Sequence, residues 1–582
     1  MRPTLTATRR ARGPIVLAVI GLSAVAAACV PPHPTPPPPT TPATSTSTTT
    51  TSTSSTTTST STTTTSSTTS TTAAPSGSCQ DDLQAFLTAA NAGTYTSPAF
   101  EVDLSGATPL DNPTTSGGSG SASTQTITFA AHDEDGDVVA PTPSNPLVVD
   151  VYGGGSRITG STPTAAAPGA DPLTLVVTSG STFSFDYDGG YLGAPLTVQA
   201  FLALGATNPC TGTPSYSLGA TTVPLGNAPT DAGTASATLP ATCDSGPAGS
   251  CAEDVVDTTG IRLAAAVGFA AGSPTGTSAP AGADPDDADY HDFTVDTGSL
   301  GVAVPGDELG PNAVGPAGPS YKYYDSSGFE YVGYLYLTPL TLRTDSGTVT
   351  TIPIRVLAVF SSGCYPGSGC TTPPDPDAFH YLGVGFDRNT PSPSSPFASP
   401  TDNALLQLAS DGPGADVAPG YILGGTGVTL GLSASDVAGF TTVPLTASSS
   451  VPGDWLTAPG FASVTPSGDT PQPQAGTVLV DTGITDMFVN GPEGTFHELD
   501  PTAAVGVMIG TSPTSPALSY SFDAGVGRTP AATGMNPSSV GLMSTSPGVY
   551  VNTGRHVLFQ YDVLFDARRG LFGVQALTTP LR

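Results

Sequence analysis

The sequence predicts an all-β protein, and two features of its composition support this. Charged residues make up only 10% of the 582 residues, whereas 69 glycines and 60 prolines favour short strands and many turns over helices. Short apolar runs recur between clusters of glycine, proline, threonine and serine, which is the pattern of strands separated by turns. The length provides material for two or three domains with sizeable cores.

The formal net charge of −31 comes from 46 acidic residues against 15 basic ones, and Lys322 is the only lysine. Such a surface repels phosphate backbones, so nucleic acid is excluded as an expected partner. An acidic surface is also compatible with acidic surroundings, where many of its carboxylates are protonated.

Residues 1–28 have the pattern of an export signal, with an arginine-bearing start followed by an apolar run from position 15 to 28. This run is short for a membrane span. The following Cys29 completes a segment that resembles a bacterial lipobox, which implies cleavage before Cys29 and lipidation of its thiol. An uncleaved anchor and simple secretion remain alternatives.

Residues 29–76 contain proline and then threonine and serine almost without interruption. This composition cannot fill a hydrophobic core, so the segment is predicted to be a disordered stalk. The stalk would hold the remaining chain away from a membrane or wall.

Residues 77–245 are predicted to form a β-sandwich-like domain. The strands are expected at residues 126–131, 147–152, 173–178, 182–187 and 196–204, between glycine- and proline-rich turns. An acidic cluster at residues 133–137 has two interpretations, a calcium site and an Asp-Gly hairpin turn, and the turn is favoured.

Six cysteines remain after Cys29, enough for three disulfide bonds in an oxidising compartment. Six cysteines allow fifteen connectivities. Short-range closure favours Cys243 with Cys251 and Cys364 with Cys370. The remaining pair is then Cys79 with Cys210, which would link distant parts of the first domain.

Two Asp-Thr-Gly turns follow apolar runs and are 185 positions apart. The first is Asp296-Thr297-Gly298-Ser299 and the second is Asp481-Thr482-Gly483. A carboxylate at the end of a buried strand is unfavourable without a compensating partner, so a matched pair indicates two carboxyls that face each other. One Asp-Thr-Gly alone would indicate no more than a surface turn.

The order of motifs in residues 255–582 resembles the pepsin-like aspartic proteases. Besides the two Asp-Thr-Gly turns, the resemblance rests on residues 261–269, 331–335, 382–383, 422–425 and 554–566. It implies a bilobal double β-barrel, with a first lobe at about residues 255–415 and a second at about 420–582. A helix is expected near residues 403–409.

The resemblance also implies roles for the matching residues. Asp296 and Asp481 would share one proton and activate a water for attack on a peptide carbonyl, a chemistry that needs no cofactor or metal. Thr297 and Thr482 would form hydrogen bonds between the two turns, across the approximate twofold axis that relates them. Gly298 and Gly483 would allow sharp turns. Ser299 would contact the outer oxygen of Asp296.

Three positions depart from the family pattern. Ile484 stands where a serine or threonine would donate a hydrogen bond to Asp481. The flap tyrosine is placed at Tyr324, with Tyr323 and Tyr331 as competing candidates. The segment 552–554, Asn-Thr-Gly, replaces an apolar-apolar-Gly element.

Other hydrolase and ligand-binding chemistries lack their motifs. The six histidines show no HExxH spacing, no CxxC is present, and His291 is interpreted as a surface imidazole.

The resemblance and the leader together predict an exported, monomeric aspartic endopeptidase that cleaves extended polypeptides and is anchored to the outer face of the membrane by lipid. The alternative is a catalytically degenerate pepsin-fold protein with a binding or adhesion role.

Overall fold

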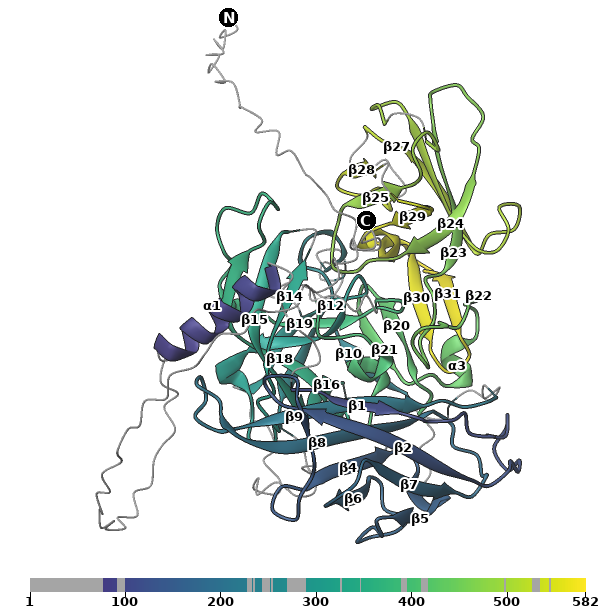
Figure 1. Cartoon of the computed structure of the whole chain (residues 1–582). Coiled ribbons are helices and arrows are strands. Elements are labelled where there is room, and N and C mark those ends of the chain that lie inside the picture. The colour runs from purple at the N-terminus through teal and green to yellow at the C-terminus, as the bar shows by residue number, and fades with distance from the viewer. Residues whose placement is uncertain are drawn as a thin grey trace, which may run out of the picture.

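The structure of the chain is a computed structural model. It describes residues 77–91, 100–227, 233, 236–242, 252, 255–269, 289–324, 327–345, 347–388, 395–409, 417–496, 499–525, 534–543 and 546–581. Strands dominate these residues and form five sheets, which confirms the all-β class (Figure 1). The predicted leader and stalk lie outside the described residues. No described helix is long and apolar enough to cross a membrane.

Two N-terminal sheets share one hydrophobic core and form the lower part of Figure 1. The five-stranded sheet contains β1 (Val102–Ser105), β2 (Ser123–His132), β3 (Val138–Val139), β7 (Thr182–Tyr187) and β5 (Ile158–Thr162), the last preceded by the turn η1 (Gly155–Arg157). The four-stranded sheet has the order β6 (Leu173–Val177), β4 (Leu147–Tyr152), β8 (Leu196–Thr207), β9 (Pro214–Val223). Alternate residues of β7, such as Phe183 and Phe185, point into this core.

The acidic cluster at residues 133–137 forms the hairpin turn between β2 and β3. Asp133 Oδ1 accepts hydrogen bonds from the backbone N–H groups of Asp135, at 3.1 Å, and Asp137, at 3.0 Å. Gly136 has a positive φ of 78°, which glycine adopts without strain. The carboxylate of Asp133 therefore stabilises the hairpin turn by accepting these hydrogen bonds, as the favoured interpretation predicts.

The first Asp-Thr-Gly turn belongs to a nine-stranded sheet. Its order is β14 (Pro319–Tyr324), β15 (Phe329–Thr338), β18 (Ile354–Cys364), β13 (Leu300–Pro305), β19 (Tyr381–Val384), β12 (His291–Asp296), β11 (Arg262–Val267), β16 (Leu340–Thr344), β17 (Gly347–Thr350). Strand β12 pairs in parallel with β19 and antiparallel with β11, so both of its edges are covered. Its last residue, Asp296, lies opposite Gly383.

The second Asp-Thr-Gly turn follows a strand of a seven-stranded sheet. The order is β27 (Leu518–Asp523), β26 (Ala504–Ile509), β23 (Pro459–Thr465), β24 (Gln474–Leu479), β29 (Val549–Asn552), β25 (Met487–Asn490), β28 (Val540–Met543). Strands β24 and β29 are parallel, and Leu479 pairs with Asn552. This register brings a polar side chain 71 residues away beside Asp481.

A six-stranded sheet connects the two halves. Its order is β10 (Ala237–Pro240), β21 (Gly427–Leu430), β20 (Gly420–Gly424), β30 (Tyr561–Asp566), β31 (Leu571–Ala576), β22 (Thr441–Pro444). The short helices around these sheets are η2 (Val255–Thr259), η4 (Gly306–Glu308), η5 (Pro376–Ala378), α3 (Ala434–Val437) and η8 (Arg555–Phe559). Strand β10 lies within the segment assigned to the first domain, but it pairs with β21 through backbone hydrogen bonds and so extends the six-stranded sheet.

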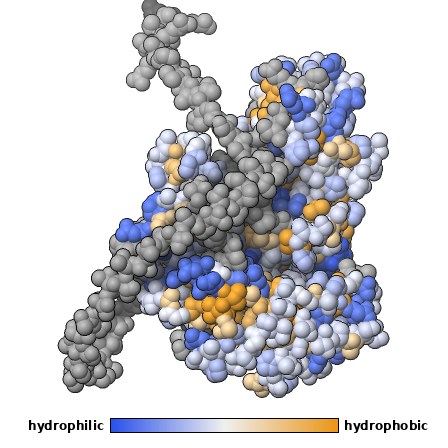
Figure 2. Space-filling model, viewed as in Figure 1, coloured by the Kyte–Doolittle hydropathy of each residue, from blue (hydrophilic) through white to orange (hydrophobic). Residues whose placement is uncertain are grey.

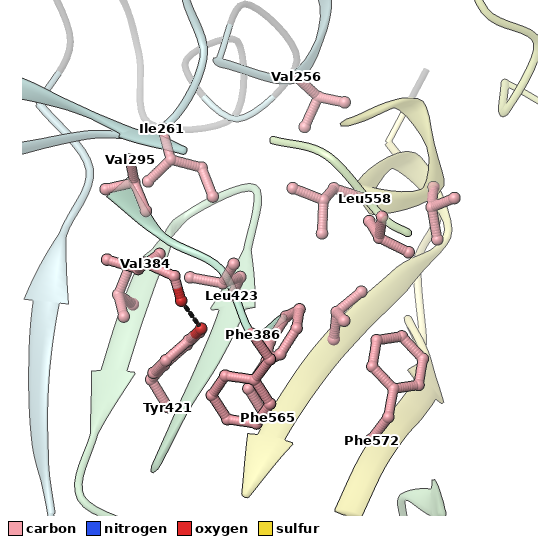
Figure 3. Packing of buried hydrophobic residues seen from close by; sticks show 14 of the residues in the cluster. Val256, Ile261, Val295, Val384, Phe386, Tyr421, Leu423, Leu558, Phe565 and Phe572 are labelled. Carbon is pink, nitrogen blue, oxygen red and sulfur yellow. Dashed lines mark hydrogen bonds between the residues drawn. The ribbon is translucent and has the colours of Figure 1, made fainter. Parts of the chain in front are cut away.

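One continuous hydrophobic core joins the six-, seven- and nine-stranded sheets. Figure 3 shows the part of this core between the nine- and six-stranded sheets. The hydroxyl of Tyr421 on β20 donates a hydrogen bond to the carbonyl of Val384 on β19. The rings of Tyr421 and Phe565 stack with centroids 5.0 Å apart, and Phe386 meets Phe565 edge-on at 5.4 Å. The three sheets are thus packed as one body, which fixes the relative positions of the two Asp-Thr-Gly turns.

The first described element is a helix, α1 (Gly77–Asn91), and not part of a sandwich strand. Cys79, Leu83, Phe86 and Ala90 lie on one buried face at the three- and four-residue spacing of a helix. That face packs against β14 and β15, where Tyr321, Val332, Tyr334 and Tyr336 complete the cluster. The segment assigned to the β-sandwich-like domain therefore begins with a helix that the sequence analysis did not predict, and this helix packs on the nine-stranded sheet.

The helix expected at residues 403–409 is also absent. The structure has two 3-10 turns instead, η6 (Pro400–Asp402) and η7 (Ala404–Leu406). The side chain of Asn403 accepts a hydrogen bond from Leu405 N–H at 3.1 Å and donates one to Val384 O at 2.7 Å. These bonds tie the segment to β19, and they compete with continuation of an α-helix.

The N-terminal sheets contact the rest of the molecule directly. Thr197 on β8 donates a hydrogen bond to Gln407 Oε1 at 2.9 Å, and the Gln199 amide donates to Pro353 O.

Figure 2 shows a mostly hydrophilic to neutral surface, with its largest hydrophobic area in the lower part of the view. The exposed large hydrophobic side chains of the described residues are Val138, Val176 and Leu456.

Candidate active site

Both aspartates sit where a buried strand ends. Asp296 is the last residue of β12, and Asp481 follows β24 by two residues. Each carboxyl-bearing residue is only 5% exposed. The preceding residues Val295 and Val480 are buried in the shared core, which explains why each Asp is held at the core's edge instead of in water.

Two threonines lock the turns together by reciprocal hydrogen bonds. Thr297 N–H donates to Thr482 Oγ1 at 3.1 Å, and Thr482 N–H donates to Thr297 Oγ1 at 3.0 Å. Each hydroxyl then donates across the interface, from Thr297 to Val480 O at 2.5 Å and from Thr482 to Val295 O at 2.7 Å. Both threonines have no solvent exposure, so all four bonds are shielded from water.

The glycines allow the two carboxyls to approach each other. Gly298 N–H donates to Asp296 Oδ1 at 2.7 Å, and Gly483 N–H donates to Asp481 Oδ1 at 2.9 Å. A Cβ placed on Gly298 would lie 2.4 Å from Asp481 Oδ2, and one on Gly483 would lie 2.5 Å from Asp296 Oδ1. Any larger residue would therefore displace the opposite carboxyl.

The pair of carboxyls is electrostatically coupled. Burial is the main cause that raises the pKa of Asp481 to about 7, and the charge of Asp296 and a hydrogen bond between the two side chains add to it. Hydrogen bonds from Asn552 and Gly483 act in the opposite direction. A hydrogen bond between two carboxyls requires that one of them carries a proton, so the arrangement favours a singly protonated pair.

Asn552 is a site residue that sequence reasoning missed. Its Nδ2 donates to Asp481 Oδ2 at 2.6 Å, and its Oδ1 accepts from Gly554 N–H at 3.0 Å. It thus supplies the donor to Asp481 that Ile484 lacks. The only signal in the sequence was that polar Asn552 stands where the family pattern has an apolar residue.

Ser299 does not make the predicted contact with Asp296. Its buried hydroxyl has no hydrogen-bond partner of normal geometry in the structure. The hydroxyl lies against the backbone of Gly383, since a Cβ placed there would be 2.7 Å from Ser299 Oγ. The neighbouring strand β19 therefore determines the position of this side chain.

Tyr324, the flap candidate, interacts electrostatically with Asp296, one of the two paired aspartates that are called the dyad below. Burial raises its pKa well above the ordinary range, followed by the effects of Tyr381 and Asp296, while the Ser299 side chain lowers it. Of the competing candidates, Tyr323 stacks on Tyr365 at 4.3 Å. Tyr331 lies in the same aromatic group as Tyr324, with its ring stacked on Phe379 at 3.5 Å. Residues 325–326, next to Tyr324, lie outside the described residues.

Tyr381, the first residue of β19, also interacts electrostatically with both aspartates, and this interaction was not predicted. Burial raises its pKa well above the usual value, and the charges of Asp296 and Asp481 contribute next. Its ring stacks on Phe379 at 5.1 Å and lies 5.0 Å from the ring of Tyr324. Together these rings form an aromatic wall beside Asp296.

Each aspartate has one cationic residue within electrostatic reach, and neither was predicted. Lys322 on β14 is 6% exposed and donates to Leu300 O at 3.0 Å and Ser395 Oγ at 3.2 Å. Burial lowers its pKa to about 8, against the effect of Asp296. On the other side, Arg388 donates to Thr457 Oγ1 at 2.7 Å and interacts with Asp481.

Two of the expected disulfide bonds are present in the structure. Cys79 on α1 is bonded to Cys210, 131 residues away, and Cys364 at the end of β18 is bonded to Cys370. The second bond closes a loop next to Phe329, which pairs with Cys364 on the hairpin that carries Tyr324. Cys29, Cys243 and Cys251 lie outside the described residues.

The chain is similar to an aspartic proteinase from Irpex lacteus, with 15% sequence identity and a TM-score of 0.34, over 59% of this chain and 98% of that one. No protein-family model and no curated protein matches the sequence. A match with so low a TM-score does not establish a function, so the geometry of the two Asp-Thr-Gly turns is the basis for proposing one.

Proposed function

We propose that the chain is an aspartic endopeptidase with a pepsin-like arrangement of two lobes. The observation that carries the proposal is the close approach of Asp296 and Asp481 over threonines that hydrogen-bond reciprocally. Two buried carboxyls that share one proton provide a general base and a general acid side by side. Neither a nucleophilic side chain nor a metal is needed for this reaction.

Asp481 is the better candidate for the protonated member of the pair. Its raised pKa, caused mainly by burial, favours retention of the proton, so we assign the role of general acid to Asp481 and that of general base to Asp296. A water held between them loses a proton to Asp296 as its oxygen attacks the peptide carbonyl carbon. Asp481 donates its proton to the carbonyl oxygen, which gives a tetrahedral diol.

The diol then collapses with the protons redistributed. The proton held by Asp296 passes to the peptide nitrogen as the C–N bond breaks, and Asp481 takes a proton back from one diol hydroxyl. The products are a carboxylic acid and an amine, and the pair returns to its singly protonated state. Buried, preoriented groups make both transfers efficient because little reorganisation is needed.

The proposed substrate is an extended polypeptide with apolar side chains near the scissile bond. The aromatic wall of Tyr324, Phe379 and Tyr381 lies on the Asp296 side and would contact such side chains. The chain's strongly acidic composition would disfavour acidic peptides by repulsion.

The test is proteolysis of casein and of a peptide library by the full-length chain across acidic to neutral pH. Asp296→Asn should lower kcat/KM by about a thousandfold or more, because the general base is lost. A pepstatin-type inhibitor should block the native chain. The matched control is Asp562→Asn, since Asp562 also has a pKa raised by burial, to about 6, but lies outside the dyad.

A second function, peptide or surface binding by a catalytically degenerate fold, is favoured by the apolar Ile484 and by Ser299, whose buried hydroxyl has no hydrogen-bond partner. Neither residue donates a hydrogen bond to its aspartate. If no turnover is detected at any pH and the native chain still binds the inhibitor, the binding function replaces the peptidase. If Asp562→Asn and Asp296→Asn lose activity equally, the dyad is not the catalytic site.

We also propose export and attachment to the outer face of the membrane through lipidated Cys29, with the monomer as the functional unit. The leader, the lipobox-like segment and the Thr/Ser-rich stretch of residues 29–76 support this. Incorporation of a labelled fatty acid into the native chain but not into Cys29→Ser would support it. Equal labelling of both chains would contradict it.

A further inference from the structure

A cluster of two histidines and a glutamate lies at the other end of the strand that carries Asp296. His291 is the first residue of β12, His380 directly precedes β19, and Glu308 is the last residue of η4. One ligand atom from each of the three side chains lies within 4.8 Å of the other two. The proposed peptidase chemistry uses none of these residues.

The two imidazoles face the same carboxylate oxygen. His380 Nε2 is 2.6 Å and His291 Nε2 is 3.4 Å from Glu308 Oε2. The two rings are nearly parallel, at 9°, with centroids 4.8 Å apart. Three donor atoms therefore converge on one small volume from three separate elements.

The sheet holds this arrangement in place from behind. Thr294 N–H donates to His380 O at 3.1 Å, where β12 and β19 run in parallel. The ring of Phe293, which is fully buried, meets the ring of His380 edge-on at 5.3 Å. The histidine backbones are thus fixed by the core, and only the side-chain tips need to adjust to a ligand.

The separations fit the ligand set of a zinc ion. Zn²⁺ takes nitrogen ligands at about 2.0–2.1 Å and carboxylate oxygens at about 2.0–2.2 Å, which places neighbouring tetrahedral donors roughly 3.3 Å apart. The two observed separations from Glu308 Oε2, 2.6 and 3.4 Å, lie on either side of this value. Small side-chain rotations would therefore accommodate the ion.

The cluster is open to water on one side. The side chains of His291, His380 and Glu308 are 31%, 14% and 19% exposed. Glu308 also interacts electrostatically with Asp377, on which Asp307 and Asp375 act as well. Their negative potential would attract a cation, and the partial exposure gives it an entry path and a position for a water ligand.

We propose that His291, Glu308 and His380 bind one Zn²⁺ ion, with water as the fourth ligand. The ion would link η4 to the start of β12 and to β19, and so stabilise the sheet that presents Asp296. Its role is structural, and the proposal does not depend on the peptidase function. The alternative is a metal-free network in which both imidazoles donate to one carboxylate.

The test is calorimetric titration of Zn²⁺ alone into the tag-free, full-length chain after chelator treatment. One ion per chain is expected to bind at this site, and its binding should raise the melting temperature. His291→Ala and His380→Ala should each weaken this binding at least about tenfold. Glu308→Gln should do the same while keeping a side chain that can hydrogen-bond to the imidazoles, which covers the case in which a histidine variant fails to fold.

The matched control is His132→Ala. His132 Nε2 lies 3.2 Å from Asp103 Oδ2, so it forms a histidine–carboxylate pair, and no third metal-ligating side chain joins this pair among the described residues. Zinc affinity and stoichiometry should be unchanged in this variant. The proposal is overturned if the native chain binds no Zn²⁺, or if the binding is equally strong in His291→Ala, His380→Ala and Glu308→Gln.

Discussion

The two half-sites around Asp296 and Asp481 share a backbone plan but differ in the side chains that surround it. Each has a buried strand, a glycine N–H bonded to its own aspartate and a threonine bonded to the opposite turn. Around Asp296 lie Lys322 and a wall of aromatic rings. Around Asp481 lie an amide donor, Asn552, and a guanidinium, Arg388.

The difference shows which parts of the site tolerate change. The bonds made by main chain and threonine are the same in both halves, because they determine the distance between the carboxyls. The outer donors differ, because a hydrogen bond to a carboxylate can come from any strand that reaches it. Asn552 on β29 donates a hydrogen bond to Asp481 and so provides the donor that the apolar Ile484 cannot provide.

The largest effect is expected from adding a methyl group at either glycine. Gly298→Ala and Gly483→Ala place a Cβ 2.4 and 2.5 Å, respectively, from a carboxyl oxygen of the opposite aspartate, so the pair must separate. Activity should fall at least about a hundredfold, in line with the cost of displacing reacting groups by about 1 Å. The measurement is kcat/KM on a fluorogenic peptide.

The control for these variants is Gly548→Ala next to β29, where an added Cβ meets nothing within 4 Å. It should retain native activity. Full activity in Gly298→Ala would show that the carboxyls do not need to be as close as the structure places them.

The second effect concerns stability and pH. The pKa of Asp481 is raised in the folded chain, to about 7, so the folded chain keeps a proton that the unfolded chain loses near pH 4. The contribution of Asp481 to the free energy of unfolding is fully present below about pH 4 and is lost as the pH rises to about 7. Asp481→Asn should therefore become more stable relative to the native chain over this window, by at most about 1.4 kcal/mol per pH unit.

Urea unfolding at a series of pH values measures this difference. Glu134→Gln, on the exposed hairpin turn, controls for the removal of one negative charge. A stability difference between Asp481→Asn and the native chain that stays constant over the window would contradict the burial of an ionisable Asp481.

The third effect tests the outer donor on the Asp481 side. Asn552→Ala leaves the buried Oδ2 of Asp481 without this donor, which costs about 1–3 kcal/mol and corresponds to a roughly 5- to 150-fold loss of kcat/KM. The apparent pKa values of the dyad should rise, because Asn552 lowers the pKa of Asp481.

Ile484→Thr offers a matched rescue, since it introduces a hydroxyl next to Gly483. The double variant Asn552→Ala with Ile484→Thr should recover part of the lost activity. If the second substitution recovers nothing, position 484 does not reach Asp481, and the two half-sites differ more than their backbones indicate.

The smallest effect is expected at Lys322. Lys322→Met removes a buried positive charge that interacts electrostatically with the Asp296 side of the pair, so both limbs of the pH–rate profile should move to higher pH by about 0.3–1 unit. Arg157→Met, which removes an equal charge from a surface pair with Asp188, should not move them. An unchanged profile in Lys322→Met would show that its charge does not act on the dyad.

The sequence predicted the features whose signals are local. The all-β class followed from composition, and the two Asp-Thr-Gly turns were recognisable because the residues that define each turn are contiguous. Helix α1 carried a local signal as well, in the spacing of Cys79, Leu83 and Phe86. It was overlooked because strand-rich composition governed the interpretation of the whole segment.

The missed site residues have no local signal. Asn552 meets Asp481 only because β29 pairs in parallel with β24, across 71 residues. Lys322 and Tyr381 meet the Asp296 side from β14 and β19, and His291 meets His380 through the same sheet. Strand register determines these contacts, and one sequence does not specify the register of distant strands.

The bond between Cys79 and Cys210 has a consequence for proteolysis of the protein itself. It closes a ring of chain that includes α1, the connection at residues 92–99 and strands β1 to β8. A protease that cuts anywhere within this ring leaves the fragments covalently joined. Helix α1, and any anchor carried on its N-terminal side, would then stay attached to the rest of the protein until a reductant opens the bond.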